Sequence, residues 1–167
     1  MRIAPVVAIF VLALGVSLVV WEANAGEHIL PDPTLTPGSV IQGITAEDVC
    51  TSGYARSARH VTAEVRQSAF DAYGLPEGNH TGYCRIEPGC ELDHLVPLEL
   101  GGSNEPSNLW PEPYDGQWNA RMKDTLENHL HGLVCAGRIG LGEAQEAIRN
   151  NWVGAYLRYL GQPSPPP

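Results

Sequence analysis

Residues 92–98 read Leu-Asp-His-Leu-Val-Pro-Leu, and three shorter pieces follow them: Gly101-Gly102, Asn108-Leu109 and Asn119. Together they supply one carboxylate, one imidazole and two carboxamides. A carboxylate can hold a hard cation, and an imidazole can take a proton from water near neutral pH. These residue types therefore indicate hydrolysis of a phosphodiester with the help of one metal ion.

The polar residues of this stretch fall on different expected elements. Residues 83–95 predict a hairpin or strand pair, and residues 101–107 a turn-rich loop. Leu109-Trp110 predicts a short strand that is ended by Pro111 and Pro113. Asp115 can cap a helix over residues 116–134, whose apolar stripe recurs at helical spacing.

Asp93 and His94 are neighbours on the expected strand. Successive side chains of a regular strand point to opposite faces of a sheet. The two can therefore share one site only if the strand ends or twists there, and Pro97 favours an end.

The flanks of this stretch are mainly helical. Thr62 can cap a helix over residues 62–73, which Gly74 stops, and residues 141–160 predict a final helix. Residues 26–61 predict an extended arm followed by an irregular segment, and residues 161–167 a disordered Pro-rich tail. The expected fold class is α+β, with one domain over residues 62–160.

The ordered pieces Asp93-His94-Leu95-Val96-Pro97-Leu98, Gly101-Gly102, Asn108-Leu109 and Asn119 resemble the HNH motif of the ββα-metal, or His-Me finger, endonucleases. The resemblance covers residues 90–123 and implies a ββα-metal core over about residues 83–135, with flanking helices packed around it. It implies that His94 is the general base, that Asp93 and Asn119 hold the metal, and that Asn108 braces the loop and orients the histidine. The implied cofactor is one divalent cation, Mg²⁺ first, with Mn, Ni or Zn as alternatives.

Two basic side chains are candidates for contact with a substrate phosphate. Lys123 lies four residues after Asn119, so the two share a helix face. It could equally form a surface bridge with Glu127. Arg85 precedes the motif strand and is the second, weaker candidate.

The first 25 residues predict a signal peptide. Arg2 is followed by an apolar run over residues 3–20, and Ala23-Asn24-Ala25 offers a cleavage site. The alternative is an uncleaved anchor, because the run nearly reaches the length of a spanning helix. Cleavage would release a secreted or periplasmic domain with no stable membrane association.

Export favours disulfides for the four cysteines. Cys84 and Cys90 flank the Pro88-Gly89 turn, which leaves Cys50 to pair with Cys135. The alternative is structural zinc, but the chain has no Cys-x-x-Cys pair.

The formal net charge of −9, with Lys123 as the only lysine, counts against a broad nucleic-acid-binding face. The sequence therefore predicts an exported endonuclease that acts on DNA, with RNA as a further substrate, through its metal and a small local patch. A toxin-like antibacterial nuclease and a non-catalytic exported binding module that keeps the HNH scaffold are the alternatives. The sequence names no protein partner.

Overall fold

The computed structural model describes residues 30–75, 82–84 and 89–163. The fold is α+β: two antiparallel strands, β1 (Cys90–His94) and β2 (Leu109–Pro113), are accompanied by helices. The helices are α1 (Ala46–Val49), α2 (Tyr54–Ala58), α3 (Ala63–Ala72), α4 (Ala120–Cys135) and α5 (Leu141–Tyr159), and two 3₁₀ turns, η1 (Leu98–Leu100) and η2 (Pro106–Asn108), join the strands. The signal peptide expected over residues 1–25 and the candidate Arg85 lie outside the described residues.

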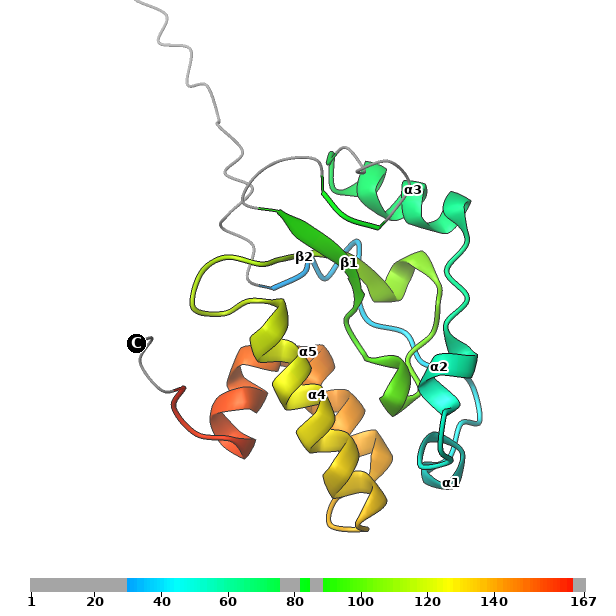
Figure 1. Ribbon diagram of the computed structural model, residues 1–167, viewed down its shortest axis with the longest axis vertical. Helices are drawn as coiled ribbons and strands as arrows, with labels where there is room; N and C mark the ends of the chain where they lie inside the picture. The colour runs from blue at the N-terminus through cyan, green and yellow to red at the C-terminus, as the bar shows by residue number, and fades with distance from the viewer. Residues whose placement is uncertain (1–29, 76–81, 85–88, 164–167) are drawn as a thin grey trace, which may run out of the picture.

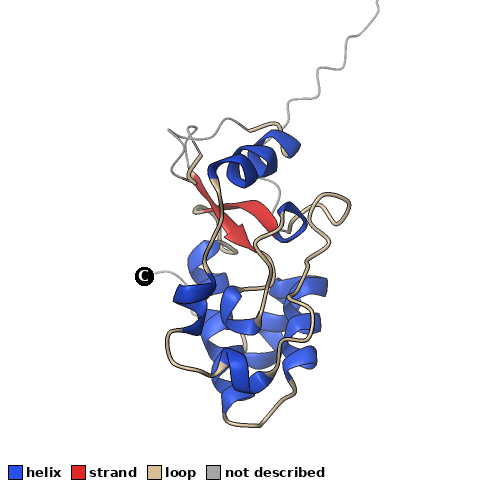
Figure 2. Ribbon diagram, turned by 90° about the vertical axis from the view of Figure 1, so that its right-hand side faces the viewer, coloured by secondary structure: helices blue, strands red, loops and turns tan. Residues whose placement is uncertain are grey.

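The helices lie on both sides of the strand pair (Figure 1). Figure 2 shows the same layering from a second direction, with α3 beyond one side of the strands and α4 and α5 on the other. The main core lies between α4 and α5, where Leu126 and Leu130 pack with Ile148 and Trp152. None of the helices in the described part of the chain has the length and apolarity that a membrane crossing needs.

Strand β2 continues through both prolines, so the prediction that Pro111 ends it is wrong. Pro111 pairs with Leu92 and Pro113 pairs with Cys90. Leu92 donates its N–H to the carbonyl of Gly82, on the side of β1 away from β2. In an antiparallel ladder the residue opposite such a position also points its backbone groups outward, so the missing proline N–H costs no ladder hydrogen bond.

The helix starts follow capping chemistry. Thr62 caps α3 as predicted, because its hydroxyl accepts a hydrogen bond from the N–H of Val65. The cap of α4 is Asn119 and not Asp115, so the helix begins later than predicted. The irregular part expected within residues 26–61 includes the short helices α1 and α2.

Both predicted disulfides are present. Cys50–Cys135 joins the end of α1 to the end of α4, and Cys84–Cys90 closes a short loop onto β1. The N-terminal arm is also fixed to the strand region, because the hydroxyl of Thr36 donates to the carbonyl of Leu109 at 2.9 Å. These links hold α1, α2 and the arm against the segment that carries the motif.

Candidate active site

Asn108 braces the loop that follows β1. Its side chain is fully buried; Oδ1 accepts from the N–H of Val96 at 2.9 Å, and Nδ2 donates to the carbonyls of Val96 and Ser103, each at 2.9 Å. Gly102 makes this closeness possible, because a Cβ there would lie 1.7 Å from the Val96 oxygen. The Gly-Gly and Asn-Leu pieces therefore fix one tight loop.

Asp93 and His94 reach different neighbours. β1 ends at His94, yet the two side chains still diverge, as alternation along a strand requires. Asp93 contacts Lys123 of α4 at 2.5 Å, whereas His94 contacts Asn104 and lines a pocket with residues around α2 and α3. Their carboxylate and imidazole do not converge on a shared partner.

Asn104 fixes the tautomer of His94. Its Nδ2 donates to the carbonyl of Ala58 at 2.8 Å, and its Oδ1 accepts from the N–H of His60 at 3.4 Å. The atom that faces His94 Nε2 at 3.1 Å is therefore an acceptor, so Nε2 carries the proton. The neutral ring keeps its lone pair on Nδ1, the nitrogen that can act as a base.

Sequence reasoning did not select Asn104. It lies in the turn-rich loop, where asparagine ordinarily serves the turn itself. Its partner Ala58 is 46 positions away along the chain, and no local spacing reports that contact.

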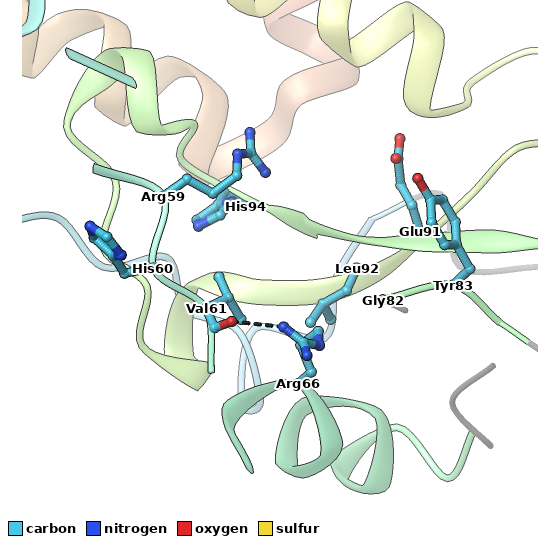
Figure 3. Close-up of a pocket in the computed structure, with 9 residues that line it drawn as sticks. All are labelled: Arg59, His60, Val61, Arg66, Gly82, Tyr83, Glu91, Leu92 and His94. Atoms are coloured by element: carbon cyan, nitrogen blue, oxygen red, sulfur yellow. Dashed lines mark hydrogen bonds between the residues drawn. The ribbon is translucent and has the colours of Figure 1, made fainter. Parts of the chain in front are cut away.

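His94 sits at the wall of a pocket of about 420 Å³. Two arginines, two histidines and one glutamate are among the residues that line this pocket. The lining comprises Arg59, His60, Val61, Arg66, Gly82, Tyr83, Glu91, Leu92 and His94. Figure 3 shows the Arg59 guanidinium beside the His94 ring. Burial lowers the pKa of His94 below its usual 6.5; Asp93 and Asn104 oppose this and Arg59 adds to it, so the ring is neutral near pH 7.

Lys123 pairs with Glu127, but the pair is not on the surface as one prediction had it. The lysine side chain is wholly buried, and it also donates to Asp93 at 2.5 Å and to the carbonyl of His94 at 2.8 Å. Glu112 lies 3.7 Å away. An ammonium has three N–H groups, and these three bonds use all of them, so none is left for a substrate phosphate.

Burial and the charge of Lys123 together shift the pKa values of Asp93, Glu112 and Glu127. Burial opposes the charge of Asp93, but Lys123 outweighs it and the pKa of Asp93 lies below its usual value. Burial raises the pKa of Glu127 to about 8 and that of Glu112 well above its ordinary value. Burial also opposes the charge of Lys123, but the three carboxyl groups outweigh burial and hold its pKa well above the usual value. Near neutral pH Lys123 and Asp93 therefore form an ion pair, while burial opposes the charged forms of Glu112 and Glu127.

Asn119 is engaged as a helix cap. Its Oδ1 accepts from the N–H groups of Arg121 and Met122, at 3.1 and 3.3 Å, and its Nδ2 donates to the carbonyl of Gly116. Both lone pairs of the amide oxygen are thus in use. Asp93 Oδ2 is held by Lys123 and Asn119 Oδ1 by the start of α4, so the pair as arranged does not fit the divalent cation expected between them.

A second group of possible metal ligands lies away from the pocket. Atoms of Cys50, His131 and Cys135 lie within 4.8 Å of one another. The two sulfurs form a disulfide, and a cysteine binds metal as its thiolate. The oxidised protein therefore offers no zinc site there.

Comparison with family models, with curated proteins and with solved structures returned no match.

Proposed function

We propose that the chain is an exported nuclease of the ββα type that hydrolyses phosphodiester bonds, with His94 as the general base. The observation that carries this proposal is the His94–Asn104 pair, which leaves Nδ1 unprotonated on a ring that lines a pocket with two arginines. The order of β1, β2 and α4, with the Asn108 brace between the strands, is what the resemblance to HNH nucleases leads us to expect. DNA is the expected substrate, with RNA as a further one.

In this proposal water attacks the phosphorus atom while Nδ1 of His94 takes one of its protons. The water oxygen forms a bond to phosphorus, and the bond between phosphorus and the leaving oxygen breaks. The leaving oxygen takes a proton from solvent, and the imidazolium later returns its proton to solvent. A neutral base with a pKa below 6.5 is in its reactive form at neutral pH.

The two disulfides support the proposed export, because such bonds form and persist in oxidising compartments. The local basic pocket suits a chain of net charge −9, since a small cationic patch can engage a phosphate where a broad face is missing.

A second candidate is a non-catalytic exported module that binds phosphate groups. The structure gives Asp93 a role in an ion pair, Asn108 a role as loop brace and Asn119 a role as helix cap. A scaffold could keep all three residues for those structural roles alone. His94 also has a structural contact, to Asn104, but only the nuclease needs its imidazole as a base, so His94 separates the two candidates.

Plasmid nicking by the full, oxidised chain tests the proposal. Wild type, His94→Ala and the control His129→Ala, on α4, are compared with magnesium, with manganese and with a chelator. We expect nicking by wild type and by the control, with a fall of about 10²–10⁴-fold for His94→Ala. No nicking by wild type under any condition would reject the nuclease and leave the binding module. Equal nicking by wild type and His94→Ala would reject His94 as the base.

A further inference from the structure

A phosphodiester is an anion, so its hydrolysis needs positive charge at the phosphate. The motif resemblance assigns that charge to a divalent cation beside Asp93. In this structure the ammonium of Lys123 lies beside Asp93, and the side chain of Arg59 lines the pocket.

Lys123 Nζ occupies the position beside Asp93. Oxygens from β1, β2 and α4 surround it: Asp93 Oδ2 at 2.5 Å, the His94 carbonyl at 2.8 Å, Glu112 Oε2 at 3.7 Å, and a carboxyl oxygen of Glu127. Hard oxygens of this kind are also the ligands of Mg²⁺. The lysine thus fills the centre of the oxygen cluster with a covalently attached cation.

Arg59 lies on the other side of β1, in the pocket with His94 (Figure 3). It is exposed and follows directly after α2, and within the described residues no hydrogen bond or ion pair engages its guanidinium. Its charge is felt at the His94 ring, whose pKa it helps to lower. A guanidinium offers a planar fork of N–H donors that matches two oxygens of one phosphate.

We propose that the pocket binds the phosphate of its substrate on Arg59, beside the His94 base, and that Lys123 takes the place of a divalent ion at Asp93. The ligand class is a phosphate diester or its phosphate group, and the proposal rests on the proposed function for its catalytic meaning. Arg59 contacts the substrate, whereas Lys123 acts only by neutralising and positioning Asp93.

The binding part is tested by titration calorimetry of the full, oxidised chain with inorganic phosphate. Arg56→Gln is the matched control, because Arg56 is exposed on α2, three residues before Arg59, and is not among the residues that line the pocket. We expect Arg59→Gln to weaken phosphate binding at least tenfold, Arg59→Lys to recover part of it, and Arg56→Gln to stay within twofold of wild type. Equal affinities of Arg59→Gln and Arg56→Gln would overturn the Arg59 assignment.

The claim that Lys123 takes the place of a divalent ion is tested in two ways. Manganese binding is measured by electron paramagnetic resonance, and hydrolysis is measured in the presence of a chelator. We expect no stoichiometric manganese site at Asp93, and wild-type hydrolysis in chelator within about twofold of that in magnesium. A manganese site that Asp93→Asn abolishes, or activity that chelator removes and magnesium restores, would overturn it. If no condition gives hydrolysis, the proposed function fails, while the phosphate and manganese titrations still decide the binding inference.

Discussion

Asn104 Oδ1 lies 3.1 Å from Nε2 of His94, and the amide is locked in that orientation by the carbonyl of Ala58. A residue of the loop between the strands therefore joins His94 on β1 to the end of α2. The contact sets both the direction of the imidazole ring and the nitrogen that carries its proton.

Asn104→Ala should slow hydrolysis by about tenfold or more, since a misoriented base forfeits part of the roughly 10²–10⁴-fold that such a group contributes. Asn104→Asp should instead shift the acid limb of the pH–rate profile to higher pH, because a carboxylate favours the imidazolium. Initial rates across pH check both, with Asn128→Ala, exposed on α4, as control. An unchanged profile for Asn104→Asp would show that Asn104 only supports the fold.

The local chemistry of the motif could be predicted from the sequence. The α3 cap at Thr62 and the disulfide pairs rest on patterns along the chain, and the structure has them. The location of Lys123 could not be predicted, because an i,i+4 pair with Glu127 looks the same on a surface as in a core. Its burial depends on Asp93 and Glu112, which come from two other elements.

Lys123→Met should destabilise the fold by up to about 3–5 kcal/mol, because it leaves the charge of the partly buried Asp93 without its ion-pair partner. Adding Asp93→Asn should recover part of that loss, since it removes the orphaned charge. Urea unfolding of the two single variants and the double variant checks the coupling. Additive losses would mean that the two side chains do not depend on each other.

The stability of the fold should fall as pH rises through the range set by Glu127. The carboxyl group has a pKa of about 8 in the fold, against an ordinary value of 4.5 in the unfolded chain. Between these values the folded state binds more protons, so the free energy of unfolding decreases as pH increases. Melting temperatures between about pH 5 and pH 8 should therefore fall more steeply for wild type than for Glu127→Gln. Parallel curves, with the exposed Glu146→Gln as reference, would contradict the raised pKa.

The two disulfides should contribute unequally. Cys50–Cys135 links residues 85 positions apart and Cys84–Cys90 links residues 6 apart. In the chain-entropy model, removal of the first should cost about 4–5 kcal/mol and removal of the second about 2–2.5 kcal/mol. Paired Cys→Ser variants and urea unfolding give the comparison. A larger loss from the short loop would show that strain or unfolded-state structure dominates over loop length.

The candidate base could be selected from the sequence, but its surroundings could not. Asp93-His94 is a local pair, and its Asn108 brace lies in the motif. The pocket is completed by Arg59, which follows α2, and by Arg66 of α3. In the sequence these arginines look like scattered surface charges.

Chemical rescue of His94→Ala by imidazole tests the role of His94 most directly. Cleavage of a phosphodiester substrate is measured at neutral pH with increasing imidazole, beside wild type. Added imidazole can enter the emptied pocket and take the proton from water, so the lost rate should return in part and saturate. Cleavage by His94→Ala at the wild-type rate without imidazole would contradict the assignment of His94 as the base.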